Sequence, residues 1–136
     1  MRYKEPLSIL MIDADHFKNI NDMHGHQTGD LALKGLVEQL SKIIRAADTL
    51  GRYGGEEFIM LMPETDLSAA HILAKRLCEQ IAAQPLQTDQ GALNVTISIG
   101  AAEFDPATDR TLMQVVEKAD QALYTAKRNG RNRVEV

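Results

Sequence analysis

Acidic side chains occur in two close pairs, each beside a segment that the sequence predicts to be a strand. Asp13 and Asp15 follow the apolar run at residues 7–12, and Glu56 and Glu57 follow two glycines. Alternation along an extended chain places Asp13 and Asp15 on one face. Carboxylates gathered at the ends of neighbouring strands repel each other unless a cation neutralises them, and they suit Mg²⁺ or Mn²⁺ that is shared with substrate phosphates. The pairs favour such a metal site, although acids also end strands and cap helices without a metal.

Gly54 and Gly55 predict a tight β-hairpin turn between strands at residues 49–53 and 58–62. Glycine adopts the positive φ that two-residue hairpin turns require at little cost. Such a turn lifts the two glutamates to the tip of the hairpin. Because adjacent acids have little β-propensity, their place there favours a bound cation.

Asn21 and Asp30 flank the Gly25-His26 turn and could read a guanine base. An ionised Asp only accepts hydrogen bonds, whereas Asn both donates and accepts. Guanine offers the matching N1–H and N2–H₂ donors and the O6 acceptor, while adenine would turn its N1 acceptor toward the carboxylate. The alternatives are that Asp30 caps the helix that follows it and that Asn21 is an ordinary loop residue.

Basic side chains gather at the end of the last predicted helix, where they could grip phosphate or simply complement the helix dipole. They are Lys127, Arg128, Arg131 and Arg133. Earlier in the chain, Arg45 and Asp48 have the spacing of a surface ion pair, which would contribute little to stability.

The elements that must position these residues alternate between strands and helices, and one antiparallel hairpin lies among them. This order predicts a mixed sheet covered by helices. Strands are expected at residues 7–12, 49–53, 58–62, 93–101 and 133–136, and helices at 17–23, 31–44 after an Asp30 cap, about 67–81 after Asp66 or Ser68, and 111–128.

Composition excludes several classes of protein. A length of 136 residues predicts one domain, and a net charge of −4 with a pI of about 5.5 argues against a nucleic-acid-binding surface. No apolar run approaches the roughly 20 residues that span a bilayer, so we expect no membrane contact by this domain and a cytoplasmic location, whether or not a longer parent protein is anchored in a membrane. Cys78, the single cysteine, is predicted to lie in the core. Three nearby histidines, His16, His24 and His26, lack the cysteine partners or the helical spacing of a zinc site.

Together these motifs resemble the GGDEF domain of diguanylate cyclases, in its GGEEF variant. The third position of that motif is Asp or Glu in the family, so Glu56 fits. The matching stretches follow the family's order and span nearly the whole chain: Asp13 to Asp22, Gly25-His26, Gly29-Asp30, Arg52 to Phe58, Ser98 to Gly100, Ala119 to Tyr124, Ala126-Lys127 and Gly130 to Arg133.

The resemblance implies an α/β (α+β) fold with a central mixed five-stranded sheet, similar to the palm folds of nucleotide cyclases and polymerases. It implies a nucleotidyltransferase in which each domain binds one GTP. Two domains would meet as a transient antiparallel homodimer, and each 3′-hydroxyl would attack the other's α-phosphate to give cyclic di-GMP and two pyrophosphates. Two Mg²⁺ or Mn²⁺ ions at each half-site would assist.

The resemblance also assigns roles to residues. Asp13, Glu56 and the backbone carbonyl of Ala14 would bind metal, Glu56 would assist deprotonation of the 3′-hydroxyl, and Glu57 would support the metal or the partner's substrate. The substrate would be held by the amides of His16, Phe17 and Lys18, by Lys127 and Arg131 at the phosphates, and by Asn21 and Asp30 at guanine, with His26 nearby.

In this family an Arg-x-x-Asp before the glycines is an inhibitory site for cyclic di-GMP. Arg45 and Asp48 fit it, and Arg76 lies where a secondary arginine is expected. The resemblance therefore implies product inhibition.

Residues 1–136 are expected to form one such domain that is N-terminally truncated, without the helix and Asp-x-Leu-Thr segment that usually precede the first strand, and without a sensory domain. The alternative is a non-catalytic receptor for cyclic di-GMP or GTP. Because Asp13, Glu56 and Glu57 are all retained, the enzyme is favoured. A palm-like transferase acting on nucleic acid is disfavoured by the net acidity.

Overall fold

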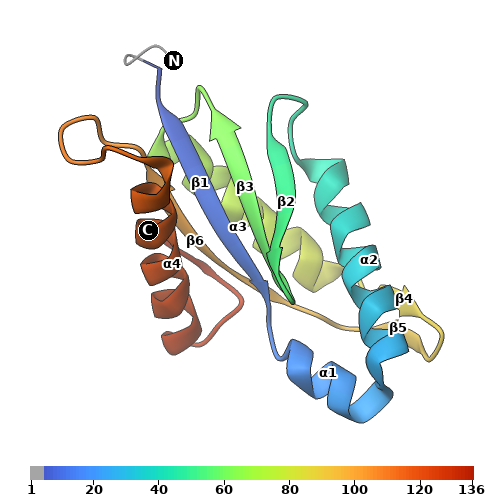
Figure 1. Cartoon of the computed structure of the whole chain (residues 1–136). Helices are drawn as coiled ribbons and strands as arrows, with labels where there is room; N and C mark the ends of the chain where they lie inside the picture. The colour runs from blue at the N-terminus through green and yellow to red at the C-terminus, as the bar shows by residue number, and fades with distance from the viewer. Residues whose placement is uncertain (1–4) are drawn as a thin grey trace.

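The computed structural model describes residues 5–136, in which helices and strands alternate along most of the chain (Figure 1). The elements in chain order are β1 (Leu7–Ala14), α1 (Phe17–His24), α2 (His26–Ile43), β2 (Thr49–Gly54), β3 (Glu57–Pro63), α3 (Leu67–Ala83), β4 (Leu86–Thr88), β5 (Gly91–Leu93), β6 (Ile97–Glu103), α4 (Leu112–Arg128) and β7 (Val134–Glu135).

A five-stranded sheet in the order β2-β3-β1-β6-β7 forms the centre of the fold. β1 pairs antiparallel with both β3 and β6, and β2 pairs antiparallel with β3. β7 lies parallel to β6 and pairs only at Ile99↔Val134 and Gly100↔Glu135. The mixed five-stranded sheet predicted from the sequence is confirmed.

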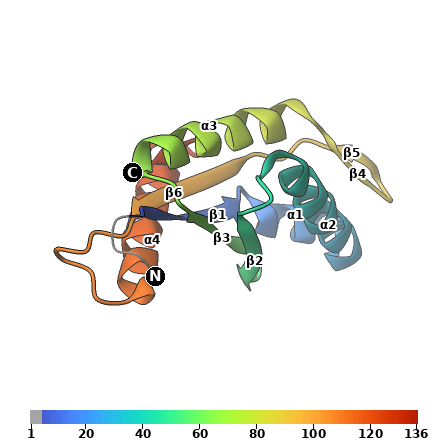
Figure 2. The same cartoon turned by 90° about the horizontal axis from the view of Figure 1, so that it is seen from above.

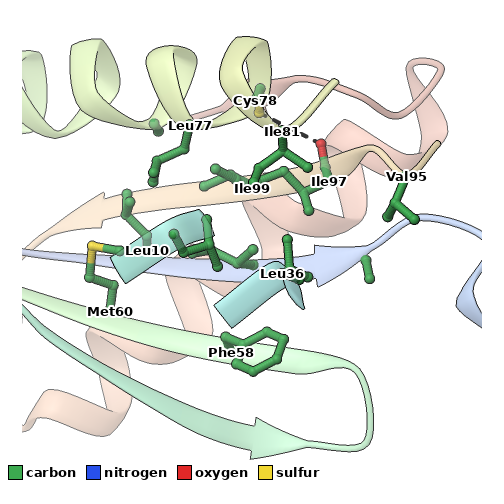
Figure 3. Close-up of a cluster of buried hydrophobic side chains, with 14 of the residues drawn as sticks. Leu10, Leu36, Phe58, Met60, Leu77, Cys78, Ile81, Val95, Ile97 and Ile99 are labelled. Atoms are coloured by element: carbon green, nitrogen blue, oxygen red, sulfur yellow. Dashed lines mark hydrogen bonds between the residues drawn. The ribbon is translucent and has the colours of Figure 1, made fainter. Parts of the chain in front are cut away.

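Helices cover both faces of the sheet, so β1 is apolar on both sides. Leu10 and Ile12 join the larger core with α2 and α3, whereas Ile9 and Met11 pack with α4. In Figure 2, α3 and α4 lie on opposite sides of the sheet. Figure 3 shows the larger core, where Leu36 of α2 points toward the strands. None of the helices in residues 5–136 has the length and apolar character needed to cross a bilayer.

β6 lies so close to α4 that residue 100 has no room for a side chain. A Cβ on Gly100 would lie 2.0 Å from the carbonyl oxygen of Ala119 and 2.2 Å from the amide nitrogen of Leu123. Glycine is therefore required for this close approach. The approach matters for function because α4 carries Lys127 to the end of β1.

The start of α2 differs from the prediction. The helix begins at His26, and no side chain caps it. The amide of Gly29 already donates to the carbonyl oxygen of Gly25 at 3.1 Å, so the helix is established before residue 30. Asp30 is thus an exposed residue within the helix and not its cap.

The strand predicted at residues 93–101 is also different. Leu93 ends β5, and β6 occupies Ile97–Glu103. β4 and β5 form a separate small hairpin, closed by the Thr88↔Gly91 pair, which the sequence did not predict. Strands of three residues are too short to give a clear alternating pattern.

The predicted starts of α3 and α4 and the core position of Cys78 are confirmed, whereas Ile72, expected on the inner face of α3, is 69% exposed. Asp66 caps α3 by accepting a hydrogen bond from the amide of Ala69, and Thr111 begins α4 in a capping box with Gln114. Cys78 is buried, and its Sγ donates to the carbonyl oxygen of Ile97 at 3.6 Å (Figure 3). Burial raises the pKa of the Cys78 thiol to about 12, so it acts as a small core residue.

We expect Gly100→Ala to lower the free energy of unfolding by about 1–3 kcal/mol, the usual cost of overpacking. Its Cβ would meet backbone atoms, which cannot turn aside as side chains can. Urea-induced unfolding followed by circular dichroism measures the effect.

Gly35→Ala in α2 is the matched control, because the nearest atom to its Cβ would be Leu86 Cδ2 at 3.5 Å, an ordinary contact. Alanine should stabilise this helix by about 0.5–1 kcal/mol. Equal effects of the two substitutions would contradict the packing argument.

Candidate active site

The predicted carboxylates meet where β1 and the β2–β3 hairpin end. Asp13 pairs across the sheet with Glu57, and the amide of Ala14 donates to the carbonyl oxygen of Glu56 at 3.3 Å. Residues directly opposite on antiparallel strands project from the same face. Asp13 is only 5% exposed, whereas both glutamates are half-buried.

Lys127 of α4 supplies positive charge to this cluster, since its Nζ forms an ion pair with Asp13 Oδ2. Burial raises the pKa of Asp13, and the lysine offsets this only in part. Burial and the charge of Asp13 also raise the pKa of Glu57. Burial alone would lower the pKa of Lys127, but its hydrogen bond and ion pair with Asp13 raise it. The carboxylates are therefore not fully neutralised by one lysine.

Asp13 also has an oxygen available for a metal ion. Its Oδ1 is buried and has no hydrogen-bond partner among the described residues. A buried oxygen without a partner is costly, and a cation would remove that cost. No three acidic, histidine or cysteine side chains within residues 5–136 form a metal cage. Asp13 and Glu56 therefore fit Mg²⁺, which takes one or two carboxylates and completes its shell with water and phosphate oxygens.

The hairpin turn differs from the predicted one. Gly54 pairs with Glu57, so the turn consists of Gly55 and Glu56. Neither glycine has a positive φ, contrary to the expectation for this turn. The side chain of Arg52 holds it, because Nε and Nη2 donate to the carbonyl oxygen of Gly55 at 2.9 and 2.6 Å.

Open space surrounds Gly54 and Gly55. A Cβ on either glycine would meet no atom within 4 Å. Neither backbone conformation nor packing within the described chain therefore requires glycine here. The space beside the turn is available to a ligand or to a second molecule.

A cavity of about 250 Å³ adjoins Asp13 at the start of α1. His16 has a left-handed φ of 56° that turns the chain from β1 into α1, and no side chain caps this helix. In the described part of the chain, the amides of residues 16–18 donate no hydrogen bond. Free amides at a helix start attract anions. The cavity is lined by the predicted substrate-binding residues His16, Phe17, Lys18, Lys127 and Arg131, together with Asp13, Ala14, Asp15, Asn19 and Glu56.

The four basic residues after α4 separate into two groups. Lys127 and Arg131 line the cavity. Arg128 lies 5.8 Å from the ring centroid of Tyr124 in a cation–π contact. Arg133 Nε donates to the carbonyl oxygen of Arg131 at 3.1 Å. The sequence left open whether these basic residues bind phosphate or only complement the helix dipole. Lys127 and Arg131 lie where they could bind phosphate, whereas Arg128 and Arg133 contact other groups of the chain.

The packing of α1 on α2 places Asn21 against Gly29, the residue before Asp30. A Cβ on Gly29 would lie 1.8 Å from Asn21 Oδ1, so the missing side chain leaves the space that Asn21 fills. Asp30 is the next residue and lines a second cavity, of about 420 Å³, between α2 and β2. His26 is exposed at the start of α2.

The β4–β5 hairpin braces this pair of helices. Asp89 Oδ1 accepts a hydrogen bond from Thr28 Oγ1 at 2.7 Å. Gln90 Oε1 lies 2.7 Å from His24 Nδ1, and Gln90 Nε2 donates to the carbonyl oxygen of His24 at 3.0 Å. The hairpin that the sequence did not predict therefore supports the α1–α2 turn.

Arg45 and Asp48 form more than the ordinary surface ion pair expected from their spacing. The Asp48 side chain is 0% exposed, and the Arg45 side chain is 50% exposed. Arg45 donates from Nη2 to Oδ1 at 2.8 Å and from Nε to Oδ2 at 3.2 Å, and it also donates to Thr65 Oγ1. The Arg76 side chain is exposed on α3 and forms no hydrogen bond or ion pair within residues 5–136. No such contact joins it to Arg45 within that range.

Two residues have positions in the site that sequence reasoning missed. Arg52 holds the hairpin turn. Asp15 was grouped with Asp13, but its oxygens accept hydrogen bonds from Thr96, Ser98 and the amide of Asn132. These donors lie 81 to 117 positions away in the chain, so no local pattern could have signalled them.

Comparison with protein families supplies the classification. Residues 1–133 match the family model described as the GGDEF domain of diguanylate cyclases. The chain belongs to the GGDEF family. The fold and the family predicted from the sequence are therefore confirmed.

Relatives of this GGDEF domain are larger proteins. It is 47% identical over 131 residues to diguanylate cyclase A of Treponema denticola, covering 96% of this chain and 35% of that protein. It is 45% identical over 130 residues to diguanylate cyclase DgcP of Pseudomonas aeruginosa, covering 96% of this chain and 19% of that protein. The chain thus spans at most about a third of these relatives.

Solved structures agree with the classification. The GGDEF domain is similar to the active GGEEF domain of a diguanylate cyclase from Vibrio cholerae, with a TM-score of 0.89 and 36% identity over 97% of this chain and 83% of that one. It is also similar to the GGDEF domain of DgcB from Caulobacter crescentus in complex with c-di-GMP, with a TM-score of 0.88 and 34% identity over 96% of this chain and 77% of that one.

We expect Gly54→Ala to change the free energy of unfolding of the GGDEF domain by no more than about 0.5 kcal/mol, as surface substitutions usually do. Its Cβ would enter open space. Because that space is available to a ligand or a second molecule, we expect the variant nevertheless to impair nucleotide turnover. Thermal unfolding and a turnover assay on the same sample measure both effects, and a loss of stability like that of Gly100→Ala would contradict the interpretation.

Proposed function

We propose that this GGDEF domain condenses two GTP molecules into cyclic di-GMP and two pyrophosphates. The observation that carries the proposal is the junction at the end of β1. There the incompletely neutralised Asp13, the hairpin tip and a cavity with free amides adjoin one another. Phosphoryl transfer depends mainly on positioning and on charge stabilisation, and this junction offers both.

The carboxylates would hold the metal. Asp13, Glu56 and the carbonyl of Ala14 are the proposed ligands for Mg²⁺ or Mn²⁺, two ions per half-site. When bound, these ions neutralise charge on the α-phosphate and favour in-line attack. Glu56, at the tip of the hairpin, would accept the proton of the ribose 3′-hydroxyl, and Glu57 would steady the site from the adjoining strand.

The triphosphate would occupy the cavity at the start of α1. The amides of residues 16–18 would donate to its oxygens on one side, and Lys127 and Arg131 would approach from the other. Lys127 pairs with Asp13 in this structure. Once Asp13 holds a cation, that lysine can turn to the phosphates.

Guanine would be read by Asn21 and Asp30. The Asp30 carboxylate caps no helix, so it can accept the N1–H and N2–H₂ groups of guanine. Asn21, fixed against Gly29, would meet the acceptor side of the base. Adenine would place its N1 acceptor against Asp30, which favours GTP over ATP.

Two domains would have to meet for the reaction. One cavity accommodates one triphosphate, and the two attacks are reciprocal, so an antiparallel homodimer would place each 3′-hydroxyl at the other's α-phosphate. The exposed hairpin tips, with open space at both glycines, suit that approach.

With Mg²⁺ and GTP, the protein at high concentration should form cyclic di-GMP and pyrophosphate, and Glu56→Gln should reduce turnover by at least about 100-fold because it removes a metal ligand and a base. Chromatography of the nucleotides measures the product. Binding of cyclic di-GMP by the variant, followed by calorimetry, should stay intact as the control. GTP binding without any product would overturn the cyclase proposal and favour a receptor.

We also propose that cyclic di-GMP inhibits the domain through Arg45, Asp48 and Arg76. Three hydrogen bonds to a buried carboxylate fix Arg45 while half of its side chain stays exposed. A guanidinium held in this way can bind a guanine edge or a phosphate without further loss of freedom.

Arg76→Ala should weaken product inhibition without altering the melting temperature, because the Arg76 side chain forms no hydrogen bond or ion pair in the described chain. Arg45→Ala should weaken inhibition and also lower stability, since it leaves the buried Asp48 without its guanidinium. Initial rates at increasing cyclic di-GMP, together with thermal unfolding, measure both. Unchanged inhibition in both variants would rule out this site.

A further inference from the structure

Asp15 lines the proposed phosphate cavity, and its carboxylate accepts three hydrogen bonds. Its Oδ1 accepts from Ser98 Oγ at 2.7 Å. Its Oδ2 accepts from Thr96 Oγ1 at 2.6 Å and from the amide of Asn132 at 3.0 Å. The residue is 6% exposed. These bonds join the end of β1 to β6 and to the turn after α4.

That turn has an unusual backbone conformation. Gly130, Arg131 and Asn132 have successive φ values of 121°, 64° and 48°. Left-handed φ angles disfavour residues with a Cβ, so the turn needs contacts that hold it. The amide of Arg131 donates to the carbonyl oxygen of Ala126 at 2.9 Å, and the amide of Asn132 donates to Asp15. The second contact ties the turn itself to the end of β1, and the residue after the turn is tied to β6, because the amide of Ile99 donates to the carbonyl oxygen of Arg133 at 2.9 Å.

The turn determines where Arg131 lies. Arg131 lines the same cavity as Lys127 and the free amides of α1. Because Asp15 binds the very next amide, a shift at Asp15 moves the backbone that carries this guanidinium. Asp15 is less available to a metal ion than Asp13, since both of its oxygens already accept hydrogen bonds whereas Asp13 Oδ1 has no partner among the described residues.

We propose that Asp15 is a positioning residue that holds the Gly130–Asn132 turn and thereby directs Arg131 to the terminal phosphates of the bound nucleotide. This inference rests on the proposed binding of GTP. It assigns to the second aspartate of the pair a task different from the metal binding proposed for Asp13.

The test compares two nucleotides in the presence of Mg²⁺: a GTP analogue with a methylene group between the α- and β-phosphates, and GMP, which lacks the terminal phosphates. Asp15→Ala should weaken binding of the analogue about tenfold, which corresponds to the loss of one charge-assisted hydrogen bond. Binding of GMP should change by no more than about twofold, because the base and α-phosphate contacts remain. Asp15→Asn keeps an oxygen acceptor and should restore most of the affinity.

A double-mutant cycle tests whether Asp15 acts through Arg131. In the Arg131→Ala background, Asp15→Ala should cause no further loss of analogue binding. Ser98→Ala is the matched control, because it removes one donor to Asp15 and leaves the bond to Asn132 in place. Equal losses for the analogue and GMP, or additive losses with Arg131→Ala, would overturn the proposal.

If Asp15→Ala does not fold, two variants at Asn132 take its place. Asn132→Gly keeps the amide and tolerates a φ of 48°, whereas Asn132→Ala keeps the amide and disfavours that φ. The alanine variant should bind the analogue more weakly than the glycine variant, with equal GMP binding, and no difference would count against the proposal. Wild-type protein that binds the analogue but makes no cyclic di-GMP from GTP would refute the cyclase function and not the role of Asp15.

Discussion

The burial of Asp13 at the end of the central strand is the constraint on which the site depends. β1 lies between β3 and β6 and is covered by helices on both faces, so a carboxylate there is removed from water. A buried charge requires compensation. α4 provides it through Lys127, and α4 can lie close enough because Gly100 has no side chain. The packing of one helix on one strand thus supports the electrostatics of the site.

The Arg45–Asp48 and Lys127–Asp13 ion pairs differ in a way that matches their proposed roles. Both carboxylate oxygens of Asp48 accept hydrogen bonds from Arg45, so the carboxylate is satisfied. The guanidinium is the group that is exposed to solvent. Asp13 forms an ion pair with Lys127 through Oδ2, and its Oδ1 has no hydrogen-bond partner in the described chain. The first pair is therefore suited to presenting a cation to a ligand. The second is suited to exchanging its lysine for a metal ion.

Much of the site is positioned by loops and turns with little regular structure. The hairpin turn is held by Arg52, the start of α1 by the left-handed His16, and the Arg131 turn by Asp15. Each contact fixes backbone next to a group with proposed chemistry. Such an arrangement fits phosphoryl transfer, in which displacement of a charged group by a small distance costs much of the rate.

Sequence reasoning was enough to predict the apolar strands, the amphipathic helices, the starts of α3 and α4 and the motif order that identifies the family, because these depend on residues close together in the chain. Tertiary structure decided the rest. Asp30 lies inside α2 and not at its cap, because the helix begins at His26. The β4–β5 hairpin is held by contacts to His24 and Thr28. The pairing of Asp13 with Lys127 and of Asp15 with Asn132 joins residues more than a hundred positions apart. Local propensity carries no information on such contacts, which arise only when the sheet and α4 have packed together.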